Sequence, residues 1–458
     1  MQEDTITAIS TPPGEGGIGI VRLSGKDAVQ VVQEIFKSKN GKVLSEVHSH
    51  TISYGHIMSS GEIIDEVLVT VMRGPCTYTR EDIVEINCHG GIVPLKRVLE
   101  LVIKKGARLA EPGEFTKRAY LNGRIDLTQA EAVADIIRAK TNASYKAALS
   151  QLNGSIYSKV EDISEVLRTI LVQMEAAIDF SGEGVMPPSH KDIQKKLMVL
   201  IDEINTLKST ADKGLVLREG LTMSIVGRPN VGKSTLFNAL LGRDRVIVTS
   251  VPGTTRDVVE EIVDIGGLPV RMADTAGIIK DSTDLIEQEG VERSLQWLSR
   301  ADLIIAVVDG SEPLTEADKH LLEDLKGRRT VVLVNKCDLP VRIELDQVKK
   351  VSGKDGLLMI SAKGGEGISE LEKRIVDTVW GGEVGSRGEP IITNIRHLDA
   401  LQRASDSLKK AVEGIGEMGE EILAFDLRKG LDSLGEIVGK VTREDILNGI
   451  FSEFCIGK

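Results

Sequence analysis

The spacing of apolar residues changes along the chain, and each change predicts a different kind of structure. Over residues 1–118 apolar residues fall in short runs bounded by turn residues, as at 5–10 and 18–23, which predicts strands. Two segments, 27–36 and 92–105, carry their apolar residues on one helical face. We therefore expect residues 1–118 to form an α+β domain.

From about residue 119 apolar residues recur every three or four positions, as in packed helices. One set of stripes runs through Leu127, Ala130, Ala134 and Ile137, through Ile156, Val160, Ile163, Leu167, Ile170 and Met174, and through Ile193, Leu197, Ile201 and Ile204. The spacing returns after residue 380 at Leu398, Leu401, Leu408 and Val412, and at Leu427, Leu431, Leu434 and Val438.

An apolar stripe on a helix must be buried against something. The simplest arrangement is one helical domain made from residues 119–218 and 380–458, and the alternative is two independent bundles. The residues Thr442-Arg443-Glu444-Asp445 also predict a capping box at the start of a last helix.

Residues 219–379 alternate strand-like and helix-like segments, as in a doubly wound α/β domain. The stretch 227–234 fits G-x-x-x-x-G-K-[ST], a loop whose backbone N–H groups cradle phosphates at the start of a helix. Lys233 is expected to reach the β- and γ-phosphates, and the Ser234 hydroxyl is expected to bind Mg²⁺. We therefore predict an inserted nucleotide-binding domain.

Further signals follow in order, each after a strand-like run. Thr255 in the stretch 253–257 could complete the Mg²⁺ shell, and 274–277 would lie at the metal and the γ-phosphate. Asp338 in Asn-Lys-Cys-Asp can accept hydrogen bonds from guanine N1–H and the 2-amino group, which adenine does not offer. The residues expected to contact GTP are Asn230, Val231, Gly232, Lys233, Ser234, Thr235, Thr249, Ser250, Val251, Pro252, Gly253, Thr254, Thr255, Asp274, Thr275, Ala276, Gly277, Asn335, Lys336, Asp338, Ser361, Ala362 and Lys363.

The usual hydrolytic groups are missing from this pattern. Ile278 stands where many GTPases have glutamine, and no arginine finger is evident. We hypothesise that K⁺ replaces the arginine, held by Asn230 and by carbonyls of 249–254; the alternative is that Asn230 only makes the turn. The water-positioning acid could be any of Asp281, Asp284, Glu287 and Glu289.

Composition narrows the class of protein. The net charge of −12 and the aromatic content of 3% argue against a broad nucleic-acid coat or a base-stacking binder, so RNA contact should be a local patch. The four cysteines lie far apart with no CxxC pair, which argues against a zinc site or a disulfide framework. There is neither a secretory signal nor an apolar run of membrane-spanning length, so we expect a cytoplasmic protein with no membrane contact.

Four stretches together resemble the MnmE (TrmE) family of tRNA-modification GTPases. They are TPPGEGGIGIVRLSG, EPGEFTKRAYLNGRIDLTQAEAVADII, the inserted GTPase with VTSVPGTTRD, and the C-terminal FCIGK. The resemblance covers essentially the whole chain, and its paired ends are the specific part. It implies a tetrahydrofolate-binding and homodimerising domain at 1–118, helical segments at 119–218 and 380–458, and a GTPase domain at 219–379.

The family implies a chemistry as well as a fold. With the FAD-dependent partner MnmG, its members install an aminomethyl or carboxymethylaminomethyl group at C5 of the wobble uridine of certain tRNAs. A 5-formyl- or methylene-tetrahydrofolate supplies the one-carbon unit. In this family two G domains meet across the dimer when K⁺ binds, which activates GTP hydrolysis.

The family's site residues are carried over position by position. The resemblance implies K⁺ ligands at Asn230, Thr249, Val251 and Thr254, Mg²⁺ ligands at Ser234 and Thr255, and a catalytic glutamate at Glu287. It implies folate contacts at Arg22, Glu81, Arg124 and Lys458. Arg124 stands where some members have lysine, which keeps the charge but changes the hydrogen-bond geometry.

Cys455 is a lone thiol three residues before Lys458. The nearby cation could lower its pKa towards a reactive thiolate, and the alternative is an inert residue in a tight turn.

Two other functions share parts of this pattern. A GTP-switched ribosome-assembly factor would have the same GTPase motifs and perform no chemistry on RNA, but no KH-type GXXG clamp is apparent in the flanking sequence. A folate-dependent aminomethyltransferase with a regulatory GTPase domain would transfer its one-carbon unit without a flavoprotein.

Overall fold

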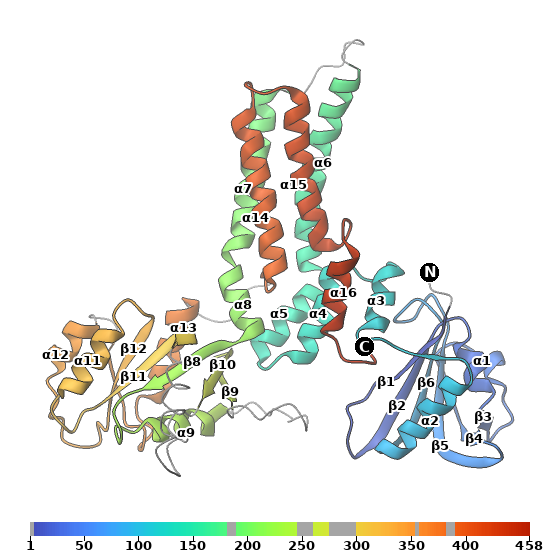
Figure 1. Cartoon of the computed structure of the whole chain (residues 1–458), viewed down its shortest axis with the longest axis horizontal. Coiled ribbons are helices and arrows are strands. Elements are labelled where there is room, and N and C mark those ends of the chain that lie inside the picture. Colours follow the sequence, from blue (N-terminus) through green and yellow to red (C-terminus); the bar gives the residue numbers. More distant parts are fainter. Residues whose placement is uncertain (1–3, 181–188, 245–259, 274–298, 353–356, 382–389) are drawn as a thin grey trace. The chain divides into compact units, whose positions relative to one another are not determined.

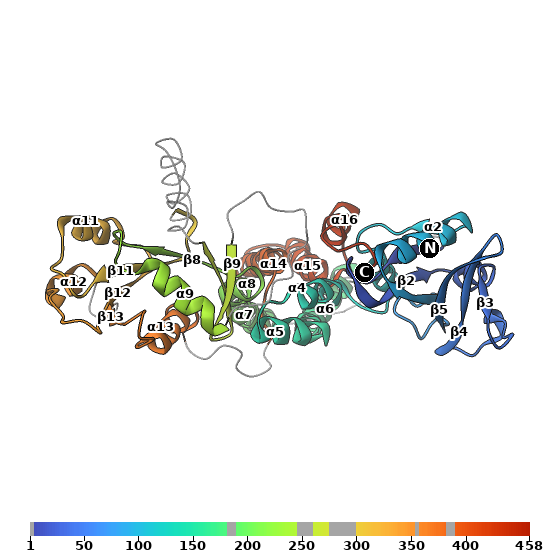
Figure 2. The same cartoon turned by 90° about the horizontal axis from the view of Figure 1, so that it is seen from below.

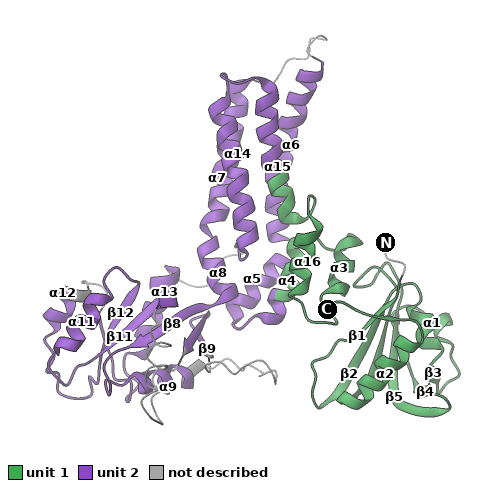
Figure 3. Cartoon of the chain, in the orientation of Figure 1, with its two compact units in different colours: residues 1–134, 432–458 green, residues 135–431 purple. Residues whose placement is uncertain are grey.

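The computed structural model describes residues 4–180, 189–244, 260–273, 299–352, 357–381 and 390–458. It divides into two compact units, residues 1–134 with 432–458, and residues 135–431 (Figure 3). The divisions fall inside two helices, α4 (Leu127–Arg138) and α15 (Glu420–Val438).

The first unit contains a seven-stranded sheet in the order β3-β4-β5-β6-β2-β1-β7 (Figure 1). Its paired strands are antiparallel except β1 and β7, which are parallel. Its strands are β1 (Ile6–Ile9), β2 (Gly16–Ser24), β3 (Phe36–Ser38), β4 (Thr51–Ser59), β5 (Glu62–Met72), β6 (Ile83–Gly90) and β7 (Arg108–Leu109). Alternate residues of β5, among them Val67, Val69 and Val71, are buried with apolar residues of α1 (Ala28–Gln33) and α2 (Ile92–Lys104). The predicted α+β architecture is confirmed.

The end of the chain packs into this same unit. Phe451 of α16 (Glu444–Ser452) and Phe454 are buried against Leu127 and Ala130 of α4. The Tyr120 hydroxyl of α3 (Glu114–Leu121) donates to the Gly439 carbonyl at 2.7 Å.

The capping box predicted at residues 442–445 is wrong. Arg443 is the N-cap of α16 and makes no side-chain cap bond. The Thr442 hydroxyl is buried with no hydrogen-bond partner in the described structure. The helix begins one residue later than the box requires, so Thr442 lies outside capping reach.

In the second unit, helices from both chain segments pack side by side (Figures 1 and 2). The helices from the first segment are α5 (Asn142–Leu152), α6 (Ser155–Asp179), α7 (His190–Ser209) and α8 (Ala211–Glu219). α14 (Ile395–Gly414) packs along α7, and Glu420 at the start of α15 accepts from His190 at 2.8 Å. The predicted joint packing of early and late helices is confirmed for this pair.

The apolar residues predicted to face the core are buried to different degrees in different helices. All six predicted residues of α6 are buried, Ile156 to Met174. On α14, Leu401 and Leu408 are buried but Leu398 and Val412 are only half-buried. Buried small residues, such as Ala404 and Ala411, take their place. Small side chains allow the backbones of α14 and α7 to approach closely. Because the predicted stripe was made of large apolar residues, it did not include these alanines.

The GTPase-like part is a six-stranded sheet in the order β13-β12-β11-β8-β10-β9. All pairs are parallel except β9 and β10. The elements are β8 (Leu221–Val226), α9 (Lys233–Asp244), β9 (Glu260–Ile265), β10 (Leu268–Ala273), β11 (Leu303–Asp309), α11 (Glu316–Asp324), β12 (Thr330–Asn335), α12 (Leu345–Ser352), β13 (Leu357–Met359) and α13 (Ile368–Trp380). Every residue of β11 is buried, as expected for a parallel strand covered on both faces.

The chain order of these strands reverses beside β8. β10 and β11 lie on its two sides, although they follow it in the sequence. Ligands of open α/β sheets bind at such a reversal, outside the carboxyl ends of the strands. The predicted inserted doubly wound domain is confirmed. Among the described residues, no helix is long and apolar enough to cross a bilayer.

Candidate nucleotide and anion sites

The predicted phosphate loop joins β8 to α9, and two of its residues must be glycine. A Cβ on Gly227 would lie 2.4 Å from the Val307 carbonyl oxygen. A Cβ on Gly232, where φ is +100°, would lie 2.2 Å from the Asn335 side-chain nitrogen. The loop is therefore pressed against the ends of β11 and β12, and only a bare backbone fits there.

Lys233 and Asn230 set the shape of this loop. The Lys233 ammonium donates to the carbonyls of Gly227 and Arg228, both at 2.8 Å, so it lies across the loop. Its partial burial lowers the pKa of the Lys233 ammonium. Asn230 has φ +66°, a left-handed conformation that asparagine tolerates better than most residues. Ser234 is exposed in the first turn of α9, where an anion and its metal would lie.

Asn335 connects three of the predicted motifs. It is 2% exposed, and its Nδ2 donates to the Val231 carbonyl of the phosphate loop at 2.8 Å. Its Oδ1 accepts from the Ala362 backbone N–H, in the loop after β13, at 2.9 Å. One buried amide thus joins the phosphate loop to both loops expected to recognise the base.

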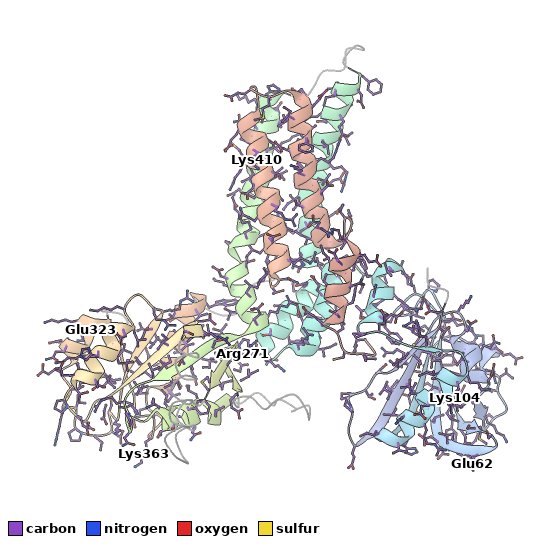
Figure 4. All side chains as sticks on the ribbon, viewed as in Figure 1. Glu62, Lys104, Arg271, Glu323, Lys363 and Lys410 are labelled. Atoms are coloured by element: carbon purple, nitrogen blue, oxygen red, sulfur yellow. The ribbon has the colours of Figure 1, made fainter. Side chains whose placement is uncertain are left out.

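Asp338 offers an exposed carboxylate beside this junction. The Ser361 hydroxyl donates to Asp338 Oδ1 at 2.7 Å. This hydrogen bond lowers the pKa of the Asp338 carboxyl, which is therefore an acceptor at neutral pH. The neighbouring Lys363 side chain is exposed (Figure 4). The arrangement suits a base edge that presents two N–H donors.

Two buried carboxylates at this site, those of Asp309 and Asp318, were not predicted from the sequence. Asp309 ends β11 and lies in register with Asn335 at the end of β12. Arg228 of the phosphate loop donates to the buried Asp318 on α11 at 2.8 Å. A signal for Asp309 was available, since it is the acidic end of an otherwise apolar strand.

The first unit gathers three of the four predicted folate residues around two aromatic rings. The Arg22 guanidinium lies 5.8 Å from the Phe115 ring and pairs with Glu85 at 2.8 Å. The Arg124 guanidinium lies 4.7 Å from the Tyr78 ring. Burial raises the pKa of the Tyr78 phenol, while the charges of Arg124 and Arg22 oppose that rise.

Lys458 belongs to the same cluster. Burial lowers the pKa of its ammonium, and the Arg22 charge lowers it further. The Lys458 carbonyl accepts from the Phe115 backbone N–H at 3.2 Å, and the Gly457 carbonyl accepts from Arg22 at 3.5 Å. We call Arg22, Arg124 and Lys458 the cationic cluster; such a cluster fits an anionic ligand with a planar part.

Glu81, the fourth predicted folate residue, is held by buried partners. Arg118 contacts its carboxylate at 3.2 Å, and the Ser24 hydroxyl donates to it at 2.7 Å. The Cys455 side chain is exposed, and its carbonyl accepts from the backbone N–H groups of Gly113 and Lys458, each at 3.4 Å.

Several predicted residues lie outside the described structure. They are Thr249, Ser250, Val251, Pro252, Gly253, Thr254, Thr255, Asp274, Thr275, Ala276, Gly277 and Glu287.

Two known protein families match this chain, each over a different range of residues. Residues 127–455 match the family described as the MnmE helical domain. Residues 5–124 match the family described as the GTP-binding protein TrmE N-terminus.

Similar proteins align over nearly their whole length. The chain is 48% identical over 462 residues to the tRNA modification GTPase MnmE of Thermoanaerobacter pseudethanolicus, covering 100% of both chains. It is 48% identical over 459 residues to that of Geobacillus kaustophilus, covering 99% of each.

Two solved GTPases show a weaker likeness. A single-residue variant of Era from Aquifex aeolicus, bound to GDP and AlF4⁻, is 30% identical, with coverage of 41% of this chain and 66% of that one and a TM-score of 0.28. The FeoB G domain of T. maritima is 27% identical, covering 34% and 98%, with a TM-score of 0.26.

Proposed function

The chain belongs to the MnmE family of tRNA modification GTPases, and on that premise we propose that it acts with a flavoprotein of the MnmG type on the wobble uridine of certain tRNAs. The product is an aminomethyl or carboxymethylaminomethyl group at C5, with GTP hydrolysis driving the cycle. The observation that best supports the GTP-binding part of this proposal is the Asn335 junction, which joins the phosphate loop to the loops around Asp338.

In the proposed GTP site each motif has one task. Lys233 leaves the loop carbonyls to neutralise the phosphates, helped by backbone N–H groups and the start of α9. Ser234, exposed in the first turn of α9, fits a Mg²⁺ ligand, with Thr255 as the second. Asp338 accepts from the guanine edge, while Ser361, Ala362 and Lys363 flank the base.

For hydrolysis we propose K⁺ at Asn230, Thr249, Val251 and Thr254, and Glu287 as the residue that positions water. The left-handed backbone at Asn230 supports a special role for this loop position. A cation bound there supplies the positive charge that an arginine finger brings in other GTPases. Turnover equal in Na⁺ and K⁺ would contradict this part of the proposal.

For one-carbon chemistry we propose that the first unit binds a tetrahydrofolate. The charges of the cationic cluster complement the carboxylates of that cofactor, and the nearby Phe115 and Tyr78 rings complement its ring. Glu81, held by Arg118 and Ser24, is a fixed acceptor for an N–H donor of the cofactor. Bound tetrahydrofolate supplies the one-carbon unit. We place this domain at 1–118 and the GTPase domain at 219–379, and propose a cytoplasmic homodimer.

The test is to reconstitute the tRNA modification reaction from purified components and to replace GTP by XTP. Purified protein, the flavoprotein, a folate donor, K⁺ and unmodified tRNA are combined with GTP or XTP, and wobble nucleosides are measured by mass spectrometry. In Asp338→Asn the side-chain amide can donate to the 2-oxo group of xanthine. We expect wild type to work with GTP, and Asp338→Asn to work with XTP and poorly with GTP.

The alternatives give different outcomes. GTP turnover without any modified uridine favours the ribosome-assembly factor. Modification without the flavoprotein favours an aminomethyltransferase acting alone. If wild type and Asp338→Asn each modify the uridine equally well with GTP and with XTP, this GTP site has no role in the modification.

A further inference from the structure

Asp309 has no role in the function proposed above, although it borders the guanine site. It is the last residue of β11, 5% exposed, and in register with Asn335. Gly310 follows it, and the Gly310 N–H donates to the Asn335 carbonyl at 2.8 Å. The ends of β11 and β12 are thus bound together where the base is expected.

Both oxygens of the Asp309 carboxylate are engaged, by different partners. Oδ2 accepts from the Lys336 ammonium at 2.5 Å. Oδ1 accepts from the backbone N–H and the hydroxyl of Ser311 at 2.9 and 2.7 Å. Burial would raise the pKa of Asp309, but the bonds from Lys336 and Ser311 outweigh it and hold that pKa below its usual range. The carboxylate therefore stays charged at neutral pH.

Lys336 is fixed at both of its ends. Its backbone has φ +65°, a left-handed conformation that is unfavourable for a non-glycine residue and persists only where neighbours enforce it. Its ammonium is held by Asp309, so the four-carbon stem is fixed at its backbone end and at its charged end. The side chain is 32% exposed, so the protein does not cover it completely.

A held lysine stem is useful beside a planar base. The stem of a lysine is apolar and can cover an apolar surface while its charged head is bound elsewhere. A free lysine loses side-chain conformational entropy when a ligand immobilises it, and that loss weakens binding. Holding the ammonium in advance removes that cost from nucleotide binding.

We propose that Asp309 is a positioning residue of the guanine site, which holds Lys336 so that its stem forms one side of the base pocket. This inference rests on the proposed function, because it requires that the loop at Asp338 binds guanine. The competing view is that Asp309 only stabilises the turn at Ser311.

A double-mutant cycle separates these views. Asp309→Asn keeps an acceptor for Ser311 and removes the charge that holds Lys336, while Lys336→Met keeps the stem and removes its ammonium. GDP dissociation constants are measured by calorimetry on the full chain, and GTP turnover gives KM and kcat. We expect Asp309→Asn to weaken GDP binding about five- to tenfold and to raise KM rather than lower kcat.

The double variant gives the decisive result. If Asp309 acts through Lys336, Asp309→Asn adds no further loss in the Lys336→Met background. Ser311→Ala is the matched control, since it removes a bond to the same carboxylate but leaves the Lys336 pair. We expect it to lower the melting temperature and to leave GDP affinity within about twofold.

Wild-type affinity in Asp309→Asn, or losses that add in the double variant, would overturn the proposal. If Asp309→Asn does not fold by circular dichroism, Asp309→Glu takes its place, because the added methylene displaces the carboxylate and predicts the same weaker binding. Wild-type protein that neither binds nor hydrolyses GTP would refute the proposed function itself. An active wild type with an unaffected Asp309→Asn refutes only this inference.

Discussion

At the scale of single residues, one carboxylate connects the charged network of the first unit. Glu114 is 5% exposed and accepts from Arg108 at 2.6 Å and from Arg118 at 3.0 Å. It also accepts from the Glu111 backbone N–H at 2.8 Å. Burial would raise the pKa of Glu114, but these partners, Arg108 first, bring it below its usual range.

The lowered pKa predicts a specific loss of stability in acid. The stabilisation is complete above the unfolded-state pKa of about 4.3 and is lost as the pH falls through the lower folded-state value. Glu114→Gln should cost about 3 kcal/mol at pH 7, because it removes one carboxylate partner from the buried Arg118 and from the partly exposed Arg108, leaving only Asp4 and Glu81 to pair with them. The difference from wild type in thermal unfolding should then shrink below about pH 4.

Glu100→Gln is the control for this prediction. Its carboxylate is 54% exposed and lies 3.9 Å from Lys96, so little stability depends on it. A difference between wild type and Glu114→Gln that stays constant from neutral to strongly acid pH would show that the charge of Glu114 does not matter.

The residues that could be predicted from sequence are those in a fixed-spacing motif. Lys233 and Asp338 are examples, because phosphate and guanine impose a residue type at a given position. Asp309 and Asp318 could not be found in this way, since their partners Lys336 and Arg228 are distant in sequence and meet them only in the folded sheet. Asp4 is of the same kind, since its partner Arg118 is distant in sequence.

At the scale of elements, one glycine brings two chain segments into contact. Gly214 lies in α8, and a Cβ there would be 2.0 Å from the Ile392 carbonyl oxygen. The Ile392 N–H donates to the Thr210 hydroxyl at 3.0 Å, which fixes the segment leading into α14. The helix and this segment are therefore too close for any side chain at residue 214.

This close approach reverses the usual preference for alanine in helices. Alanine for glycine in a helix interior normally stabilises by about 1 kcal/mol. Gly214→Ala should instead destabilise by about 1–3 kcal/mol, because backbone must move. Gly242→Ala in α9, where a Cβ meets nothing within 4 Å, should be neutral or stabilising. Thermal unfolding of both variants checks this; equal effects would contradict the role of contact at Gly214.

The presence of a helix was easier to predict from the sequence than the residue at which it begins or the residues that it buries. The stripe of α6 could be predicted because large apolar residues repeat along it. The start of α16 could not, because a Thr-x-x-Asp pattern permits a cap and the position of the first turn decides whether it forms. His397, which is fully buried on α14, could not be assigned to the core from its polarity.

At the scale of the whole molecule, the cationic cluster and the phosphate loop belong to different compact units. Residues 455–458 contribute to the first unit through Gly113, Phe115 and Arg22. Deleting them should weaken 5-formyltetrahydrofolate binding more than tenfold, an order-of-magnitude expectation for losing a charged contact. The KM for GTP should stay within about twofold, because the GTP site shares none of these residues.

Calorimetry with the folate and steady-state GTP turnover measure the two effects. Lys458→Ala, which keeps the backbone contacts, should lose less folate affinity than the deletion. A parallel loss of GTP and folate binding would show that the two sites are coupled through these residues.

The division into units was only partly predictable. Matching stripes before and after the GTPase motifs indicated the discontinuous helical part, since unpaired apolar faces need partners. The family resemblance implied that Lys458 joins Arg22, but it did not predict that all of residues 432–458 are grouped with residues 1–134, because that grouping depends on Phe451 and Phe454 meeting α4.

The interrupted helical bundle has a consequence for how the protein is made. α14 packs along α7, and α15 is paired with α7 through Glu420 and His190 and with α6 through Arg428 and Glu175, yet the whole GTPase domain is translated between the early and the late helices. At about 5–20 residues per second, the apolar faces of α6 and α7 wait on the order of ten seconds or more for these partners. During that time the GTPase domain can fold, while the waiting helices are open to misassociation. The newly made chain therefore has its greatest need of chaperone protection in residues 155–209, well before synthesis ends.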